Sequence, residues 1–383
     1  TDAISLLRGN QSEIKAIYDA LNTNHKVNNS LSGKGVDGEQ VEDSAIITYR
    51  LARQINCPVV ATGEEDYVSD GTRVFAVPHG HPIMTVVTGT GCLLGAVLAA
   101  FFSSYCPFMY NMSIGEFLAY ALAYYGLAGE SAVNVSGVKP GSFSMAFMDA
   151  LYEFDDAMLL SENRIRPVVV PDQLKVYFIS GTQDVGFNES HLLDIVEAAC
   201  RGGATCFQFR EKGIGTLEGQ QKLELAQQLK EICAMYNVLY IINDDVDLAV
   251  AVNADGVHVG QEDMRLEDVR NLVGNKVVGI SIHSVEELHK TTVVYADCVG
   301  VGPMYTTSSK PDAQLPCGPE RIADLRAEGL TLPCVGIGGI TLNNAKPVLE
   351  AGASGVAVIS AIAHADNPYE ATQQFKCLVD NIK

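Results

Sequence analysis

The second half of the chain alternates short apolar runs, each of strand length, with segments whose apolar residues recur at helical spacing. In the segment 217–235, for example, Leu223, Ala226, Leu229 and Cys233 fall on one face of a predicted helix. The apolar runs are predicted strands at residues 176–179, 205–209, 238–242, 256–259, 277–282, 297–301, 334–337 and 355–359. Eight strands with intervening helices predict a (β/α)₈ TIM barrel.

The first half has a less regular pattern that still mixes helices and strands. Helices are predicted at 12–21, 41–55, 93–103, 115–134 and 142–154, and a short buried strand at 58–62. The polar, asparagine-rich residues 22–32 predict a loop, and the apolar run 83–87 leads into a glycine-rich turn. This half is therefore predicted to be an α/β domain.

A break in the pattern at 161–167, followed by Pro171, predicts a boundary between two domains. We expect an α/β domain at residues 1–165, a linker at 166–173 and the barrel at 174–383. With 383 residues, 47% of them hydrophobic, the chain is long enough to form two separate cores.

Composition and charge argue against several classes of function. A formal net charge of −20 argues against binding to nucleic acid, because such binding normally requires a basic face. The longest apolar run, 92–102, is too short to span a bilayer, and no signal-peptide pattern opens the chain, so we expect a cytoplasmic protein. The ten cysteines contain no CxxC pair, which argues against a zinc site and a disulfide framework and favours packing roles for most of them.

The glycine-rich turn at 88–92 (TGTGC) is the candidate site of the first half. Its glycines allow backbone N–H groups to approach a ligand, and the N-terminus of the following helix favours negative charge, as on a phosphate. Small residues before an apolar helix also serve close packing, and a lone cysteine such as Cys92 is commonly a core residue. Both interpretations stay open on these residues alone.

Polar residues follow nearly every predicted strand of the barrel, at the end where the loops face a common site. Candidate site residues are Gln208, Arg210, Lys212, Asn243, Asp244, His258, Asp263, Ser281, His283, Thr307, Ser309, Lys310, Gly338, Gly339, Ile359 and Ser360. Asp244 and Asp263 provide the oxygen ligands that Mg²⁺ takes when it also contacts phosphates. Arg210, Lys212 and Lys310 would neutralise a diphosphate on that metal.

Each of these residues also has a structural alternative. A lone aspartate after a strand often caps a helix, and a lone lysine is usually solvated. The matched chemistry of eight loops favours a shared site. His258 and His283 stay open between packing inside the barrel and a role in that site.

Five motifs of the first half, in this order, resemble those of hydroxyethylthiazole kinase. They lie at 8–10 (RGN), 33–37 (GKGVD), 62–64 (TGE), 66–71 (DYVSDG) and 88–92 (TGTGC). That family has a ribokinase-like α/β fold and uses ATP and Mg²⁺ to phosphorylate the hydroxyethyl group of the thiazole precursor of thiamine. The resemblance covers only the later part of such a kinase, so it implies a partial ribokinase-like domain that is N-terminally incomplete.

The kinase resemblance also implies residue roles. Arg8 and Thr62 would lie on the nucleotide, Gly89 on the thiazole alcohol, and Cys92 where related sugar kinases carry an aspartate base. Because a thiol is a weaker base than a carboxylate, positioning would contribute more than proton abstraction. Related kinases assemble as trimers, which implies a homo-oligomer.

The motifs of the second half look like those of thiamine-phosphate synthase. They lie at 208–212 (QFREK), 241–244 (IIND), 256–263 (GVHVGQED), 300–303 (GVGP), 336–340 (GIGGI) and 356–360 (VAVIS). That family joins hydroxymethylpyrimidine diphosphate to thiazole phosphate, which releases pyrophosphate and forms thiamine monophosphate.

This second resemblance implies a role for each matching residue. The pyrimidine diphosphate would be held by Gln208, Arg210, Lys212, Asn243, Ser281 and Lys310, the Mg²⁺ by Asp244 and Asp263, and the thiazole phosphate by Thr307, Ser309, Gly339, Ile359 and Ser360. Two residues depart from the family pattern. Asp245 stands where a basic residue is common, which would weaken diphosphate binding, and Ser309 replaces a usual threonine but keeps its hydroxyl.

The sequence therefore predicts a thiamine-biosynthesis fusion that acts on small molecules and in which the kinase product is the synthase substrate. In one alternative, the first half is a non-catalytic nucleotide-binding or oligomerisation module. In another, the barrel acts on a different phosphorylated substrate.

Overall fold

The computed structural model describes residues 4–22, 40–110, 112–153, 159, 161–162, 164–307 and 315–382. The chain divides into two compact units, Thr1–Val168 and Val169–Lys383. The motif at 33–37 and two predicted site residues, Ser309 and Lys310, lie outside the described residues.

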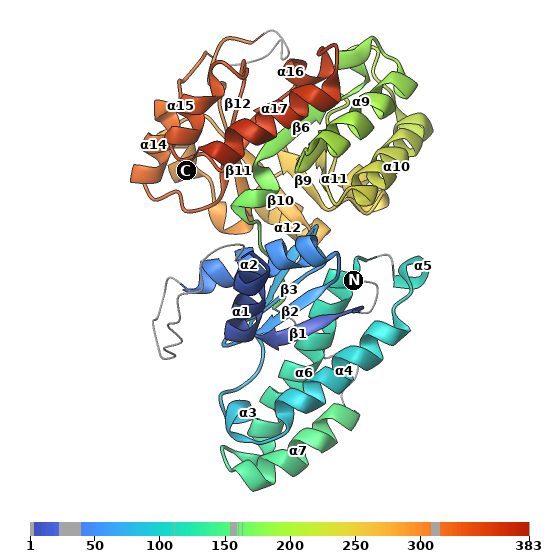
Figure 1. Ribbon diagram of the computed structural model, residues 1–383, viewed down its shortest axis with the longest axis vertical. Helices are drawn as coiled ribbons and strands as arrows, with labels where there is room; N and C mark the ends of the chain where they lie inside the picture. Colours follow the sequence, from blue (N-terminus) through green and yellow to red (C-terminus); the bar gives the residue numbers. More distant parts are fainter. Residues whose placement is uncertain are drawn as a thin grey trace. The chain divides into compact units, whose positions relative to one another are not determined.

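The first unit is built on a mixed five-stranded sheet (Figure 1). In spatial order its strands are β1 (Leu7–Asn10), β2 (Val59–Thr62), β3 (Asp66–Ser69), β4 (Val74–Val77) and β5 (Arg166–Pro167). β1 and β2 run parallel, and the other neighbours run antiparallel. β2 confirms the strand predicted at 58–62.

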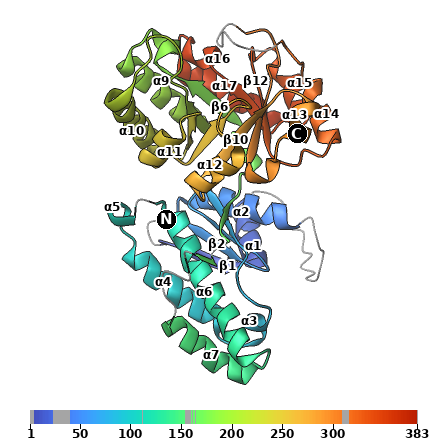
Figure 2. The same ribbon diagram turned by 180° about the vertical axis from the view of Figure 1, so that it is seen from behind.

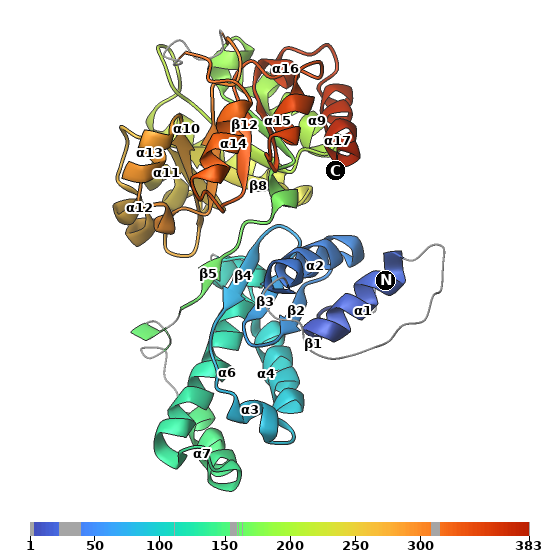
Figure 3. The ribbon, with the colours of Figure 1, turned by 90° about the vertical axis from the view of Figure 1, so that its left-hand side faces the viewer.

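Helices cover both faces of this sheet. They are α1 (Gln11–Asn22), α2 (Gln40–Ile55), α3 (Ile83–Val86), α4 (Thr90–Ser104), α5 (Pro107–Tyr110), α6 (Ile114–Ser136) and α7 (Pro140–Glu153). α2 contacts β2 and β3, whereas α6 contacts β3 and β4 and also packs on α4 and α7 (Figure 3). Val59 and Val60 point to opposite faces of β2 and are both fully buried. All five helices predicted for this half are confirmed.

The segment predicted as the linker, 166–173, carries structure at both ends. β5 pairs with β4 of the first unit, and the 3₁₀ helix η1 (Pro171–Leu174) precedes the first strand of the second unit. Val169 and Leu174 belong to the same buried cluster as the barrel residue Tyr177. Val169 and Leu174 therefore extend the core at the N-terminal end of the barrel.

The second unit is a closed barrel of eight parallel strands (Figures 1 and 2). They are β6 (Val176–Ser180), β7 (Cys206–Phe209), β8 (Leu239–Asn243), β9 (Gly256–Val259), β10 (Val277–Ile282), β11 (Cys298–Val301), β12 (Cys334–Ile337) and β13 (Gly355–Val358). Each strand pairs with the next along the chain, and β13 closes the ring on β6. The predicted barrel is confirmed, with strand ends shifted by at most a residue or so.

Helical segments surround this barrel. They are η2 (Thr182–Val185), α9 (Glu189–Gly202), α10 (Gly219–Met235), α11 (Val246–Ala251), α12 (Leu266–Val273), α13 (Val285–Lys290), η3 (Val293–Tyr295), α14 (Glu320–Ala327), α15 (Ala345–Glu350), α16 (Ser360–Ala363) and α17 (Pro368–Asn381). α17 packs on α9, next to the seam where β13 meets β6.

Alternation of side chains along each strand divides the barrel core into two layers. On β6, Tyr177 points into the barrel, whereas Phe178 points outward to the helices. The outer layer contains an aromatic row in which the ring centroid of Phe207 lies 5.5 Å from that of Phe178 and 6.2 Å from that of Tyr240. Tyr240 satisfies its hydroxyl by donating to the carbonyl of Ala226 at 2.9 Å.

Phe207→Ala should lower the free energy of unfolding of the barrel by about 3–5 kcal/mol, because removal of this fully buried ring leaves a cavity between two aromatic neighbours. Denaturant titration followed by circular dichroism measures the loss. Leu272→Ala is the control, since a side chain that is 54% exposed should contribute less than about 0.5 kcal/mol. Equal losses in the two variants would contradict the assignment of Phe207 to the core.

Candidate functional site

The loops that follow the parallel strands meet at one face of the barrel. Gln208, near the end of β7, is 3% exposed and donates from its amide nitrogen to the hydroxyl of Tyr177 at 3.2 Å. Arg210 and Lys212 follow directly on the chain; Arg210 is buried and Lys212 is exposed. The predicted residues of this strand therefore extend from the barrel interior to its rim.

An acidic pair and a lysine converge beside this strand end. Asp244 follows β8 with a φ of +60°, a left-handed conformation that aspartate tolerates, and its backbone N–H donates to the carbonyl of His258. The ammonium of Lys212 donates to Oδ2 of Asp244 at 2.7 Å. Asp263 follows β9, and its Oδ2 accepts from the N–H of Gly260 at 2.8 Å.

Burial and neighbouring charges act together on the pKa of Asp244. Burial raises the pKa of Asp244, the hydrogen bond from Lys212 opposes the rise, and the adjacent Asp263 carboxylate raises it further. The same contact with Asp244 raises the pKa of Lys212. Two neighbouring acids with one ammonium form a local charge cluster that a divalent cation would stabilise.

His258 lies inside the barrel against two glycines. Its Nε2 is 3.0 Å from the hydroxyl of Ser281, a predicted site residue. A Cβ at Gly279 on β10 would collide with the imidazole, and one at Gly300 on β11 would lie 3.2 Å from its Cε1. The absence of those side chains makes room for the ring next to Ser281. His283, in contrast, holds its Nδ1 2.9 Å from a carboxylate oxygen of Glu287.

The loops after the last strands form a second part of the same face. Gly338 and Gly339 have φ values of +98° and +64°, and the carbonyl of Gly338 accepts from the N–H of Tyr305 at 3.0 Å. A Cβ at Gly339 would collide with the carbonyl of Thr306, so the glycine turn packs directly on the loop that carries Thr307. Ile359 and Ser360 follow β13, which pairs with β12, and so lie at the same end.

Asp245 is turned toward a neighbouring helix. Its Oδ2 accepts from the ammonium of Lys222 on α10 at 2.7 Å, and its Oδ1 accepts from the N–H of Leu248, which caps α11. Burial opposes ionisation, but these hydrogen bonds hold the pKa of Asp245 below its ordinary value. Asn243, two residues earlier on β8, pairs in register with His258 on β9. Its backbone carbonyl accepts a hydrogen bond from the N–H of Asp245.

The four predicted site residues of the first unit lie on adjacent elements. The guanidinium of Arg8 donates to the hydroxyl of Thr62 at 3.4 Å, and a Cβ at Gly91 would lie 3.5 Å from the same guanidinium. Gly89, with a φ of +99°, is the residue before α4, and Cys92 is exposed in the first turn of that helix. Within the described part of the chain, Nε of Arg8 is buried without a hydrogen-bond partner.

Two further residues of this cluster had no predicted role. Tyr125 on α6 donates to the carbonyl of Thr90 at 2.6 Å and lies near the guanidinium of Arg8. Asp66 accepts from the N–H of Gly63 at 2.9 Å. Its carboxyl is surrounded by protein although the residue is partly exposed, and burial raises its pKa to about 7 despite Arg8 nearby. Asp66 is the first residue of the motif at 66–71, so its place in that motif is the sequence signal that could have identified it.

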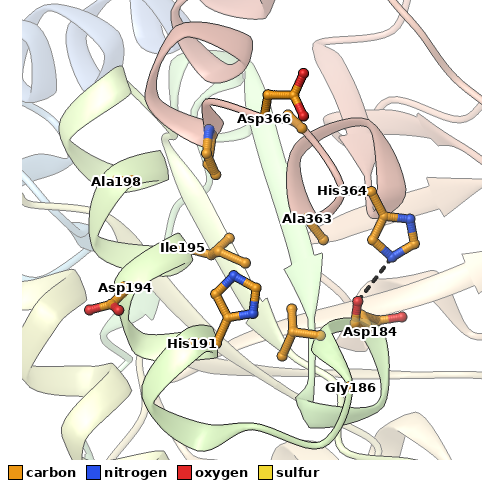
Figure 4. A pocket seen from close by; sticks show the side chains of 12 residues that line it. Asp184, Gly186, His191, Asp194, Ile195, Ala198, Ala363, His364 and Asp366 are labelled. Carbon is orange, nitrogen blue, oxygen red and sulfur yellow. Dashed lines mark hydrogen bonds between the residues drawn. The ribbon is translucent and has the colours of Figure 1, made fainter.

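A cavity of about 510 Å³ lies elsewhere, between η2, α9 and the connection from α16 to α17 (Figure 4). Its polar lining includes His191, Asp194, His364 and Asp366. The imidazole Nε2 of His364 lies 2.9 Å from the carbonyl oxygen of Asp184. The cavity is lined by none of the predicted site residues that the structure describes, so it is separate from the acidic pair.

Comparison with known proteins separates the same two parts of the chain. The family model for thiamine monophosphate synthase matches residues 176–362, and that for the hydroxyethylthiazole kinase family matches residues 1–157. The thiamine-phosphate synthase of Geobacillus kaustophilus (strain HTA426) is 51% identical over 205 residues, which cover 54% of this chain and 91% of that protein. The chain belongs to the thiamine-phosphate synthase family.

Other members of the thiamine-phosphate synthase family are also similar to this chain in sequence or structure. The enzyme of Geobacillus thermodenitrificans (strain NG80-2) is 49% identical over 205 residues, again 54% of this chain and 91% of that protein. The solved structure of thiamine phosphate pyrophosphorylase from Pyrococcus furiosus is similar with a TM-score of 0.50 at 32% identity, covering 56% of this chain and 99% of that one. Both predicted family resemblances are confirmed.

The described residues contain no group of three or more histidine, cysteine, aspartate or glutamate side chains placed to hold a metal ion. Among the same residues, none of the helices has the length and apolar character that a membrane crossing requires.

Asp66→Asn should remove a pH dependence of stability, because the asparagine oxygen can still accept from Gly63 but carries no proton. The raised pKa means that the folded protein binds this proton more tightly than the unfolded chain, so wild-type stability relative to the variant falls as the pH rises from about 4 to 7. The slope is at most about 1.4 kcal/mol per pH unit. Denaturant titrations over that range measure the difference, and parallel curves would contradict the raised pKa.

Proposed function

We propose that the barrel condenses hydroxymethylpyrimidine diphosphate with thiazole phosphate to give thiamine monophosphate and pyrophosphate. The observation that carries this proposal is the convergence of Lys212, Asp244 and Asp263 at the loop face of a barrel that belongs to this family. A cluster of this kind suits a substrate whose diphosphate is bound together with a divalent cation.

We assign the pyrimidine diphosphate to the charged side of the face. Gln208, Arg210, Lys212, Asn243, Ser281 and Lys310 would hold this substrate. The contact between Gln208 and Tyr177 and that between Ser281 and His258 support a polar pocket inside the barrel for the pyrimidine ring. The compensation of Asp245 by Lys222 supports its compatibility with diphosphate binding.

Asp244 and Asp263 would hold Mg²⁺. Their donor set fits that ion, because Mg²⁺ is typically bound by one or two carboxylates together with substrate phosphates and water. The raised pKa of Asp244, to which the Asp263 carboxylate contributes, supports the same assignment, since a cation between the two acids would relieve their repulsion. When bound, Mg²⁺ supplies charge neutralisation on the departing pyrophosphate.

The thiazole phosphate would occupy the side formed by the last loops. Thr307, Ser309, Gly339, Ile359 and Ser360 are its proposed ligands. The packing of the glycine turn on the loop of Thr307 supports a shared anion site, because glycines with positive φ allow backbone N–H groups to face a phosphate.

The residues support a mechanism without a strong protein base. The bond between the pyrimidinylmethyl carbon and the diphosphate oxygen breaks, and Arg210 and Lys212 stabilise the charge on the leaving pyrophosphate. The resulting pyrimidinylmethyl cation forms a new bond with the thiazole nitrogen. No proton has to be removed from either substrate, so the protein's part is to orient the reactants and exclude water.

Asp244→Ala and Asp263→Ala should each lower the rate of pyrophosphate release by about 100-fold or more, because each removes a charge that holds the cation. The assay mixes full-length protein with both phosphorylated substrates and Mg²⁺ and follows pyrophosphate. Asp247→Ala, at an exposed acid on α11, is the matched control and should keep the wild-type rate. Absence of pyrophosphate release by the wild type, or full release by both site variants, would refute the synthase proposal.

We further propose that the first unit binds ATP and phosphorylates hydroxyethylthiazole. Arg8 and Thr62 would contact the nucleotide, Gly89 the alcohol, and Cys92 would face its hydroxyl. The buried, unpartnered Nε of Arg8, among the described residues, supports a ligand beside the glycine turn. The N-terminus of the 15-residue helix α4 lies at the same turn and favours negative charge.

Cys92→Ala should lower ATP-dependent phosphorylation of hydroxyethylthiazole by about tenfold, less than the loss of a strong general base, because the thiol mainly positions the alcohol. Transfer of labelled phosphate from ATP measures the rate. Cys377→Ala, which removes another exposed thiol, should have no effect. A wild-type protein that binds ATP but transfers no phosphate would instead support a non-catalytic nucleotide-binding module.

The two proposed reactions are chemically consecutive, because phosphorylated thiazole is the product of one and the substrate of the other. We propose that both occur in the cytoplasm and in a homo-oligomer. Light scattering of the purified protein tests the second point.

A further inference from the structure

Glu211 lies between the two cations of β7's loop but is bound to a different part of the barrel. Its Oε2 accepts from the backbone N–H of Thr182 at 2.8 Å, and its Oε1 accepts from the hydroxyl of Thr182 at 2.5 Å. Oε1 also accepts from the N–H of Leu217 at 2.9 Å. Three donors therefore satisfy this carboxylate, and two of them come from η2, the loop after β6.

The hydrogen bond to Leu217 closes the base of a short glycine loop. Gly213 and Gly215, with φ values of +126° and +84°, lie within this loop, and both conformations are costly for other residues. A Cβ at Gly215 would lie 3.5 Å from the ring of Phe187, which follows η2. Glu211, at the start of this loop, is thus hydrogen-bonded both to Leu217 at the end of the loop and to Thr182 in the loop after β6.

The backbone of Arg210 is held by the same neighbour. Its N–H donates to the carbonyl of Ser180 at 3.0 Å, and its carbonyl accepts from the side-chain amide of Gln183 at 2.7 Å. Gly181 packs so closely on that carbonyl that a Cβ would collide with it. The loop after β6 therefore fixes the backbone on the N-terminal side of Glu211.

Lys212 differs from its two predecessors. Its side chain is half exposed and forms an ion pair with Asp244 on the next loop. The long methylene stem of Lys212 must be ordered to make this partly exposed ion pair, so the pair is weak unless the backbone beneath it is fixed. In the described loop, the carboxylate of Glu211 supplies the adjacent fixed point.

We propose that Glu211 is a positioning residue that holds Arg210 and Lys212 for the diphosphate, acting through Thr182 and Leu217 and without touching the substrate. This inference rests on the proposed function of the barrel. A carboxylate is required because all three partners are donors: with an amide, one N–H₂ group would face a backbone N–H whichever way it turns.

The test compares Glu211→Gln with the wild type in the full-length protein. We expect KM for hydroxymethylpyrimidine diphosphate to rise about tenfold, which corresponds to about 1.4 kcal/mol, while KM for thiazole phosphate stays unchanged. Calorimetry with inorganic pyrophosphate and Mg²⁺ should show the same weakening of Kd. Glu218→Gln, at an exposed acid just after the loop, is the matched control and should match the wild type.

Thr182→Val tests the route of the effect, because it removes the hydroxyl donor and keeps the shape of this buried side chain. If Glu211 acts through Thr182, the double variant should raise the diphosphate KM by less than the product of the single effects. Multiplicative effects, equal rises in both KM values, or an unchanged Kd for pyrophosphate would each overturn the inference.

Product formation by the wild type distinguishes failure of the synthase proposal from failure of the positioning role. If the wild type forms no product from the two substrates, the synthase proposal is wrong, and the calorimetric comparison still decides whether Glu211 positions a pyrophosphate site. If the wild type forms product and Glu211→Gln leaves the diphosphate KM unchanged, the positioning role alone is wrong.

Discussion

Closing eight parallel strands into a ring turns the carboxyl end of every strand to the same face. The Lys212–Asp244 ion pair exists because β7 and β8 are neighbours in that ring and end at the same level. Asp263 reaches the pair because β9 is the next strand. A barrel with one strand out of register would point alternate side chains to the other layer and disperse this cluster.

The proposed site combines charges of both signs, whereas the protein as a whole is acidic. The chain carries a net charge of −20, yet Arg210 and Lys212 stand at the mouth of the barrel. Two of the lysines near the barrel mouth form ion pairs with aspartates: Lys212 pairs with Asp244, and Lys222 pairs with Asp245. A substrate with several negative charges, delivered with a cation, suits such an arrangement better than a general polyanion does.

The two units use the same physical device in different folds. In both, a glycine with positive φ stands beside a proposed phosphate site, and such a turn allows backbone N–H groups to approach an anion. Gly89 before α4 and Gly339 after β12 are the two examples. The two family matches connect the units through thiamine biosynthesis, and in the proposed function one intermediate would link their two reactions.

Periodicity and motifs in the sequence determined the fold class, the eight barrel strands, the helices of the first half and the group of residues at the barrel mouth. The strands and helices depend on neighbours along the chain, so a pattern of apolar residues predicts them, and the residues at the barrel mouth follow from their places after the strands and from the family motifs. Only the tertiary structure decided that His258 occupies space left by Gly279 and Gly300, that Asp245 meets Lys222, and that Glu211 joins two loops. Those contacts link residues on different strands and loops, and a single sequence carries no signal for which polar groups meet once the barrel closes.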